Sequence, residues 1–365
     1  MNVTIAGAGV VGCAIAHELA ARGARVRVLD SRVPGGGATR ASAGILAPYI
    51  EGHDQTLLSL GLRSLGMYRD FLARITLDSG QDVEHERNGT IQIASSLEDA
   101  NQLKRTARSL GDAGVERRLL DAVEVRRIEP AVTAAAVAGL HIPCHGHVAA
   151  GDLTRALVAA AMRHGAAFDV GSAVAIEGGG AARVRTLGEV IESDAVILAA
   201  GSWSTSVEGV RAGPDTLKPI RGQLLQLRLP QRPASHVIWG SQCYLVPRRD
   251  GAVLVGATME DVGFDERATS AGVQQLLDRA LALMPVLRDA AFEEVRVGLR
   301  PKTVDELPAV GASSTMPHVF YATGHYRNGV LLAPLTARLI ADLVLDGKSD
   351  VDLALLAPRR LGLGD

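Results

Sequence analysis

The sequence predicts an α/β fold with two interleaved parts: a discontinuous domain built on a parallel sheet, and a second, mostly antiparallel domain. Three observations support this prediction. The chain opens as strand, glycine turn, helix and strand, and two more apolar strands run into glycines much later, near 201 and 324. Between these two, residues 217–256 alternate apolar and polar residues as antiparallel strands do. With 365 residues, the chain is long enough for more than one core.

The first 30 residues have the pattern of a β-α-β unit. Residues 3–6 are predicted to form a short buried strand, and residues 10–22 carry apolar side chains at helical spacing. The segment RVRVL is predicted as a second strand that ends at Asp30. Residues 32–48 follow without periodicity, and a loop of that length in a compact domain usually has a function.

The remaining elements are predicted from the same two periodicities. Helices are expected at about 54–76, 97–111, 151–164 and 269–284, with a last one in the apolar run 330–344. Strands are expected in GTIQIAS, AVAIEG, ARVRT, SDAVILAAGSWS, IRGQLLQLRL, CYLVPRRDG, AVLVGAT, the segment leading to Arg300, and HVFYATG.

These elements predict an interleaved organisation. Parallel-type strand and helix pieces occur at the start, in the middle and at the end of the chain, and two inserts separate them. The first domain is expected to comprise 1–47, 148–214 and 299–365, and the second 48–147 and 215–298.

Composition and charge exclude several function classes. The formal net charge is −2 and aromatic residues make up only 3%, so neither electrostatic binding to nucleic acid nor stacking on its bases is expected. The three cysteines are far apart and odd in number, which fits a reducing compartment. The apolar N-terminus lacks a basic leader, and Arg338 and Asp342 interrupt the C-terminal apolar run. We therefore expect a soluble cytoplasmic protein without a membrane span.

A dinucleotide site is predicted where the first strand meets the first helix. Gly7, Gly9 and Gly12 fit the pattern G-x-G-x-x-G: the first makes the turn, the second leaves room for a pyrophosphate, and the third lets helix and strand pack closely. The helix N-terminus then faces the phosphates. Asp30, at the end of the second strand, is placed to accept from ribose hydroxyls and disfavours NADP. The first domain is thus expected to be Rossmann-like, and FAD and NAD remain as cofactors.

Two distant segments favour FAD over NAD. VILAAGSWS, with Ala200 and Gly201, brings another strand end toward the nucleotide. ATGHYRNGVLLAP adds a strand-to-helix turn near the C-terminus, where a helix starting near Asn328 would direct its positive end at a ligand. A long cofactor such as FAD is often held at several remote points of a chain, whereas NAD enzymes rarely need their last helix at the cofactor.

The set of motifs resembles the D-amino acid oxidase superfamily of flavoproteins, and within it the glycine oxidase family. The motifs span residues 3–334: GAGVVG followed by VRVLD, ASAGILAP, AAGSWS, CYLVPRRDGAVLVGATM, VGLRP followed by DELPAVG, and GHYRNGVLLAP. The resemblance implies an FAD-binding, Rossmann-like domain and a mostly antiparallel substrate-binding domain.

The resemblance also implies which residues contact FAD. In addition to Gly7, Gly9, Gly12, Ala200 and Gly201, they are Val10, Val11, Asp30, Ser31, Thr39, Ala43, Gly44, Ile45, Val174, His325, Tyr326, Arg327, Asn328, Gly329, Val330 and Leu331. Two positions depart from the family pattern: Arg40 stands where small or hydroxyl residues are common, and Asp30 replaces the more usual Glu. No cysteine stands near VGLRP, so the FAD is expected to be non-covalent.

Four residues are candidates for substrate binding. Arg300 is expected to clamp a carboxylate, because a guanidinium matches the planar geometry of that group. Tyr244 would hydrogen-bond the same carboxylate, Met259 would line the pocket, and Arg327 would make a secondary contact. The alternatives are an ordinary ion pair for Arg300, packing for Tyr244 and Met259, and a helix-start charge for Arg327. No catalytic general base is identified.

The reaction implied by the resemblance is oxidation of glycine or another small amine, such as sarcosine or a small D-amino acid. A hydride passes from Cα to flavin N5, and with O2 the products are an imine, then a 2-oxo acid, ammonia and hydrogen peroxide. The family is associated with thiamine biosynthesis. Two alternatives stay open: a dehydrogenase subunit of the hydrogen cyanide synthase or opine oxidase type, and a nucleotide-binding regulator without activity. The resemblance also leaves open a homo-oligomer, either a tetramer or a dimer.

One cluster superficially resembles a metal site. HIPCHGH places His141, Cys144, His145 and His147 within seven residues, but a zinc site usually needs a second paired element elsewhere, and none is found. We expect a solvated loop here and no metal.

Overall fold

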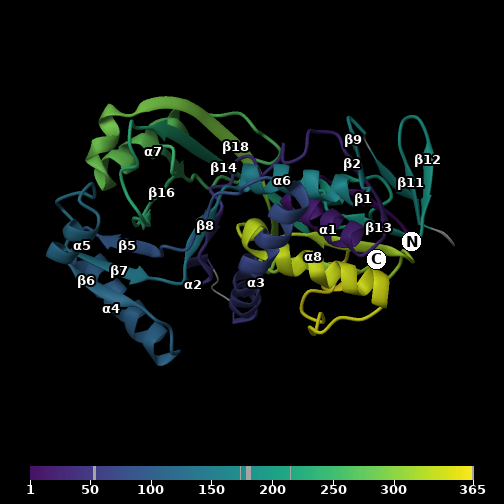
Figure 1. Ribbon diagram of the computed structural model, residues 1–365, viewed down its shortest axis with the longest axis horizontal. Helices are drawn as coiled ribbons and strands as arrows, with labels where there is room; N and C mark the ends of the chain where they lie inside the picture. Colours follow the sequence, from purple (N-terminus) through teal and green to yellow (C-terminus); the bar gives the residue numbers. More distant parts are fainter. Residues whose placement is uncertain (52–54, 173, 178–181, 214, 364–365) are drawn as a thin grey trace.

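The computed structural model describes residues 1–51, 55–172, 174–177, 182–213 and 215–363. Residue 54, where the first long helix was predicted to start, and residues 173 and 178 of the predicted strand AVAIEG lie outside the described residues. Two sheet-based parts lie side by side along the long axis of the molecule, and both chain ends lie together at one end (Figure 1).

The first part is built on a six-stranded sheet with the order β19-β20-β13-β1-β2-β9. Its strands are β1 (Asn2–Ala6), β2 (Arg25–Asp30), β9 (Ala167–Val170), β13 (Ala195–Leu198), β19 (Ala309–Ala312) and β20 (Val319–Thr323). All neighbouring strands pair parallel except the edge strand β19, which is antiparallel to β20. The parallel strands run outward from β1 in both directions, which is the order of a Rossmann-type sheet.

Helices cover this sheet and form the larger core. They are α1 (Val10–Ala21), α3 (Gln55–Ser79), α6 (Ala150–Arg163) and α8 (Gly329–Asp346), and α1 and α3 each pack against α6 and α8 (Figure 1). Helix α1 is almost fully buried, which explains its run of small apolar residues. Helix α8 ends at Gly347, whose φ of +67° is the left-handed conformation typical of a glycine after a helix.

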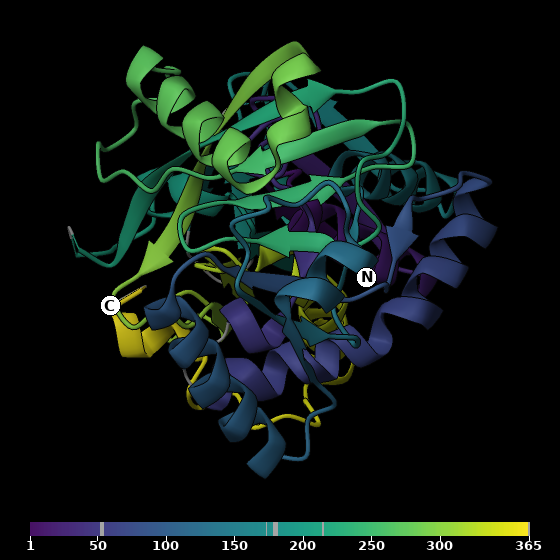
Figure 2. The ribbon, with the colours of Figure 1, turned by 90° about the vertical axis from the view of Figure 1, so that its left-hand side faces the viewer.

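The second part is an eight-stranded sheet with the order β18-β14-β17-β16-β15-β5-β7-β6. The strands are β5 (Thr90–Ala94), β6 (Arg118–Asp121), β7 (Ala138–Ile142), β14 (Leu217–Arg228), β15 (Val237–Trp239), β16 (Tyr244–Pro247), β17 (Ala252–Gly256) and β18 (Ala291–Thr303). Neighbours pair antiparallel except β15 and β5. Figure 2 looks onto this end of the molecule, with α7 (Ser270–Leu283) and α4 (Leu97–Asp112) on its outer sides.

Two small three-stranded sheets contain the remaining strands of the described residues. One has the order β3-β8-β4, with β3 (Ile45–Leu46), β4 (His85–Glu86) and β8 (Gly146–Val148). The other is β10-β11-β12, with β10 (Ala175–Glu177), β11 (Ala182–Arg185) and β12 (Val190–Ser193). The short helices α2 (Pro48–Glu51) and α5 (Ala122–Ile128) and the 3-10 turns Gly201–Ser206, Pro285–Asp289 and Pro358–Leu361 make up the rest.

The predicted fold class is confirmed, since parallel and antiparallel sheets alternate along the chain as expected. The domain boundaries stay a prediction: strand β18 runs through the predicted boundary between 298 and 299. None of the described helices combines the length and apolar character needed to cross a bilayer.

The prediction of a solvated loop at 141–147 is wrong. His141 lies in β7, which ends at Ile142, and His147 lies in β8, so the segment is a tight connection between two strands that each pair with other strands. His145 is completely buried, shares a hydrogen bond of 2.9 Å with Thr90 and stacks on Tyr49. His147 is 2% exposed and lies 3.5 Å from Glu84. The polar residue types suggested exposure to solvent, whereas the paired strands on both sides of the segment bury the imidazoles of His145 and His147.

This burial predicts a loss of stability in acid. Burial, with help from His141 and Arg87, lowers the pKa of His145 to about 3. The unfolded chain takes up this proton near pH 6.5 and the folded chain only near pH 3, so the free energy of unfolding falls with decreasing pH in that interval, by about 2 kcal/mol between pH 6.5 and pH 4.5. Urea unfolding of His145→Gln should show a shallower pH dependence than the parent. If the free energies of unfolding of the two proteins changed equally with pH, His145 would not be the cause of the loss of stability in acid.

Candidate active site

A cavity of about 530 Å³ lies where the order of the six-stranded sheet reverses. Strands β1 and β13 are neighbours there, with β2 beyond β1 on one side and β20 beyond β13 on the other, and the two strands are followed by Gly7 and Ala199. Both residues line the cavity. A reversal of strand order opens a crevice at the carboxyl ends of the strands, where open α/β sheets bind their ligands.

The glycine motif forms one wall of this cavity. Gly7 has φ +117°, and a Cβ there would come closer than 3.0 Å to the backbone of Ala199. A Cβ on Gly12 would come equally close to the carbonyl oxygen of Gly7. Gly9 differs: the nearest atom to a Cβ there is Thr39 Oγ1, at 3.6 Å. The first and third glycines are therefore required by the fold, while the second leaves open space in front of α1.

Polar groups fix the entrance to α1. Asp30 accepts hydrogen bonds from the backbone N–H groups of Ala8 (2.7 Å) and Arg32 (2.8 Å), one on each carboxylate oxygen. The N–H of Val10 donates to the hydroxyl of Thr39 at 3.1 Å. The loop between 31 and 47 thus folds back over the start of α1, and the first N–H groups of the helix face the cavity without carbonyl partners from their own helix.

The C-terminal turn forms another wall of the cavity. After β20 the chain turns at Gly324 (φ +74°), and Tyr326 holds a left-handed φ of +48°. Its N–H donates to the carbonyl oxygen of Pro301 at 2.9 Å, which ties the turn to β18. His325 is buried and shares a hydrogen bond of 3.0 Å with Thr336; burial lowers the pKa of His325 to about 4, so its imidazole is neutral at pH 7. Helix α8 begins at Gly329, with its N-terminus at the cavity.

The eight-stranded sheet closes the cavity with an arginine and a tyrosine. The guanidinium of Arg300 lies directly over Gly222, where any Cβ would clash with it, and donates from Nη1 to the carbonyl oxygen of Thr258 at 3.0 Å. The ring of Tyr244 lies over Gly256 in the same way. Two glycines on strands β14 and β17 therefore make room for two side chains that line the cavity.

Further side chains surround this pair. Trp239 packs against Tyr244 with 5.1 Å between ring centroids. The hydroxyl of Tyr326 donates to the sulfur of Met259 at 3.0 Å, and the guanidinium of Arg327 lies 5.3 Å from the centre of the Tyr326 ring. Met259 is 67% exposed, so this part of the cavity opens to solvent.

Comparison with known proteins identifies the family. Residues 2–343 match the model of the family described as FAD dependent oxidoreductase, also called DAO. The chain belongs to this FAD-dependent oxidoreductase family. The resemblance inferred from the motifs is confirmed, and the cofactor of the family is FAD.

The similar proteins carry consistent names. The chain is 34% identical to a glycine oxidase of Geobacillus kaustophilus over 97% of this chain and 95% of that protein. The crystal structure of glycine oxidase from the same organism superposes with a TM-score of 0.92 at 32% identity, covering 97% of each chain. A bifunctional protein ThiO/ThiG of a Nostoc species is 36% identical over 96% of this chain but only 53% of its own length. The chain thus spans about half the length of that curated relative.

The cavity of this family member fits FAD. Gly9 leaves the space that a pyrophosphate needs, α1 presents its N-terminus, and the carboxylate of Asp30 lies at the end of β2, where a ribose is held in such sheets. Because the turn at 325–330 lines the same cavity, one extended ligand can reach both.

The structure brings most of the predicted site residues to this cavity. Those that line it are Gly7, Gly9, Val10, Val11, Asp30, Ser31, Thr39, Ala43, Gly44, Ile45, Val174, Ala200, Gly201, Tyr244, Met259, Arg300, His325, Tyr326, Arg327, Gly329 and Val330. Three are not part of the lining: Gly12, Asn328 and Leu331. Gly12 packs against Gly7, Asn328 caps α8, and Leu331 packs toward Gly61 of α3.

Several lining residues were not predicted. Trp203 and Trp239 line the cavity, and the guanidinium of Arg32 lies 4.3 Å from the Trp203 ring centre while pairing with both oxygens of Glu266. Thr258 offers its carbonyl to Arg300. The two tryptophans could have been singled out from the sequence as candidate site residues, because the chain has only two of them.

A buried cation behind the cavity was also missed. Arg248 is 7% exposed and donates from Nη2 to the carbonyl oxygens of Ala43 (2.8 Å) and Val148 (3.4 Å). Burial lowers the pKa of Arg248, and its Nη1 has no hydrogen-bond partner among the described residues. Arg248 therefore holds the cavity loop at Ala43 in place from the side of the antiparallel sheet.

Proposed function

We propose that the protein is an FAD-dependent oxidase of glycine and other small amines, such as sarcosine and small D-amino acids. The observation that carries this proposal is the guanidinium of Arg300, which lines the cofactor cavity and is held flat over Gly222 by its bond to Thr258. The names of the relatives, glycine oxidase and ThiO, support the same substrate class.

The four substrate residues have distinct roles in this proposal. Arg300 binds the carboxylate through two parallel hydrogen bonds, a geometry that lysine cannot reproduce. Tyr244 donates its hydroxyl to the same carboxylate. Met259 and Arg327 border the open side of the cavity, where Met259 limits the length of the substrate and Arg327 makes a secondary contact.

The protein's contribution to the chemistry is orientation and electrostatics. FAD, when bound, supplies the hydride acceptor for oxidation of the amine carbon. The N-terminus of α8 adds positive potential at the end of the cavity where negative charge would accumulate. We assign no general base, because His325 is committed to Thr336, and we infer that the amine loses its proton to water.

We infer that the cofactor is held without a covalent bond. Cys243 lines the cavity, but burial raises the pKa of its thiol to about 11, so that it is protonated and weakly nucleophilic at pH 7. Acid precipitation of the purified protein should release all of its flavin into the supernatant. Flavin that stays with the pellet would show a covalent link.

We propose that the immediate product, the glycine imine, supplies the thiazole of thiamine. The joining of ThiO to ThiG in one relative supports this assignment. A cytoplasmic location is consistent with the three free cysteines. A homo-oligomer, tetramer or dimer, stays a prediction.

An anaerobic reduction experiment tests the proposal. The FAD-loaded protein is mixed without oxygen with glycine, sarcosine, D-alanine and D-proline in turn, and the visible flavin absorbance is followed. Glycine is expected to bleach it, and admission of O2 should restore the colour with one peroxide per flavin. Bleaching without peroxide would instead indicate a dehydrogenase that needs a partner. If none of the amines reduced the flavin, the proposed function would be wrong.

Substitution of Gly222 tests the position of Arg300 without touching that residue. A Cβ in Gly222→Ala would come closer than 3.0 Å to the guanidinium, which must shift. We expect the KM for glycine to rise by roughly 10- to 100-fold, since displacing a bidentate clamp costs about 1.5–3 kcal/mol, while the flavin spectrum stays unchanged. Gly66→Ala is the matched control, because nothing lies within 4 Å of a Cβ there. If the KM for glycine were unaltered in Gly222→Ala, the proposed position of the Arg300 guanidinium over Gly222 would not be needed to bind the carboxylate.

A further inference from the structure

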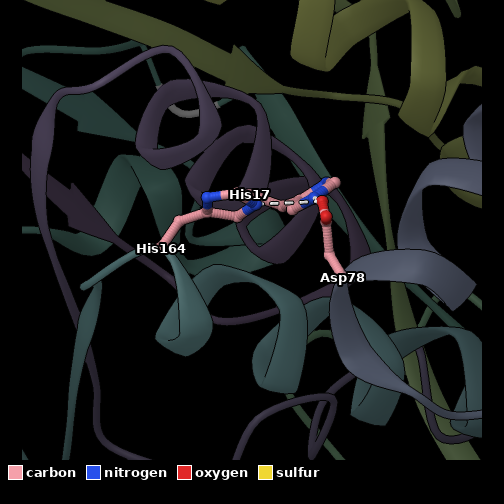
Figure 3. A group of neighbouring side chains, drawn as sticks. All are labelled: His17, Asp78 and His164. Atoms are coloured by element: carbon pink, nitrogen blue, oxygen red, sulfur yellow. Dashed lines mark hydrogen bonds and ion pairs between the residues drawn. The ribbon is translucent and has the colours of Figure 1, made fainter.

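A second cluster of polar side chains lies on the helical layer, away from the cavity. His17 belongs to α1, Asp78 to the last turn of α3, and His164 directly follows α6 (Figure 3). The Nε2 atoms of His17 and His164 lie 2.7 and 3.0 Å from Oδ2 of Asp78. One ligand atom of each residue lies within 4.8 Å of both others, and this is the single group of its kind in the described ranges.

We propose that these three side chains form a binding site for a divalent transition-metal ion of the zinc class. Two imidazoles and one carboxylate are a ligand set that proteins use for such ions, with the remaining positions filled by water. The site is distinct from the FAD cavity, which none of the three residues lines.

The distances suit a metal with little rearrangement. Zinc bonds to imidazole nitrogen and carboxylate oxygen measure about 2.0–2.2 Å, so neighbouring ligand atoms lie about 3.0–3.5 Å apart. The two pairs that include Asp78 are already within a few tenths of an ångström of this spacing. Helix α6 packs against both α1 and α3, so the arrangement is held by rigid elements.

The charge state and access also suit a metal. Burial lowers the pKa of His17 despite its bond to Asp78, so this imidazole is neutral at pH 7. Burial alone would raise the pKa of Asp78, but the hydrogen bonds from His17 and His164 outweigh it and the net direction is downward. His17 is 1% exposed, whereas the side chains of Asp78 and His164 are 21% and 32% exposed. An ion can therefore enter from the side of His164 and keep water ligands there.

The neighbouring positive charges are partly compensated. Glu18, beside His17 in the chain, pairs with Arg22 and Arg74, and Arg22 also pairs with Asp342. Nη1 of Arg163 donates to the backbone carbonyl of Asp78 at 3.3 Å and leaves the carboxylate oxygens to the histidines. Nδ1 of His17 has no hydrogen-bond partner among the described residues. The three ligand positions are 17, 78 and 164, too far apart for any sequence motif, which is why the sequence predicted no metal.

Zinc binding to the FAD-loaded protein tests the proposal. The protein is stripped with a chelator, dialysed to equilibrium against buffered free Zn²⁺, and its metal content is counted per flavin. We expect one equivalent of zinc in the parent, and an affinity at least about 100-fold lower in Asp78→Asn and in His164→Ala, since loss of even an outer-shell partner costs 10- to 100-fold. His318→Asn, which removes an exposed histidine elsewhere, should bind as the parent does.

The two variants also distinguish a metal site from a clip, by which we mean the same three side chains held together by hydrogen bonds alone. Asn in place of Asp78 can still accept from an imidazole N–H, so a clip would survive where a zinc ligand is lost. His164 is the most exposed of the three residues, so its removal leaves the buried packing intact. Zinc should also raise the melting temperature of the parent but not of either variant. Absence of zinc binding by the parent, or equal binding by all four proteins, would overturn the proposal and leave only a clip between α1, α3 and α6.

Discussion

Replacing Arg300 with alanine should raise the KM for glycine by about 100- to 1,000-fold, because removal of one partner of a buried charged pair costs about 3–4 kcal/mol. Bound FAD should be unaffected, since Arg300 projects from β18 of the antiparallel sheet and not from the glycine motif of α1. Steady-state kinetics with glycine, together with the flavin absorbance of the purified variant, measure both effects.

Two further variants sharpen this result. Arg300→Lys keeps the charge but loses the planar fork, so it should recover only part of the lost affinity. Arg296→Ala is the matched control: Arg296 lies on the same strand, pairs with Glu294 and does not line the cavity. If Arg300→Ala bound glycine as the parent does, or if Arg296→Ala were equally impaired, Arg300 would not be the carboxylate clamp.

Replacing Gly9 with leucine should abolish FAD binding while the protein still folds. The backbone of Gly9 is at φ −70°, which any residue can adopt, and a Cβ there would meet no atom closer than 3.6 Å. The side chain would instead project into the space in front of α1 that the pyrophosphate needs. We expect an FAD dissociation constant at least about 1,000-fold higher, since a side chain in this space removes the phosphate contacts as a group.

Circular dichroism and flavin titration separate folding from binding in this variant. A helix content equal to that of the parent, with no flavin retained after gel filtration, is the expected pair of results. Gly66→Ala should match the parent in both measurements, because its position on α3 is open. Full flavin retention in Gly9→Leu would place the pyrophosphate elsewhere.

The sequence predicted the elements that depend on local patterns. The strand, turn and helix around Gly7, Gly9 and Gly12 and the start of α8 after Asn328 follow from periodicity and from glycines that must turn or pack closely. Helix α5 was missed although Asp121 and Glu124 form a capping box, because a helix of 7 residues is too short for its periodicity to stand out.

The remaining features depend on contacts between distant residues. Arg300 can lie flat because residue 222 is a glycine, and Tyr244 can reach the cavity because residue 256 is a glycine. In both cases the two residues come together only through the pairing of strands in the sheet. Arg248 was not singled out in the predicted strand CYLVPRRDG, yet it is buried and donates to the carbonyl oxygens of Ala43 and Val148. The histidines of 141–147 were misread for the same reason, since burial is decided by the strands that pair across them.

A crystal structure of the protein with FAD and acetate would show whether one cavity holds both the cofactor and the carboxylate. Acetate has the carboxylate of glycine but no amine to oxidise, so the complex should persist. We expect FAD to extend from the N-terminus of α1 to the turn at 325–330, with the acetate carboxylate on the guanidinium of Arg300 and within reach of Tyr244. FAD bound outside this cavity, or acetate bound away from Arg300, would contradict this expectation.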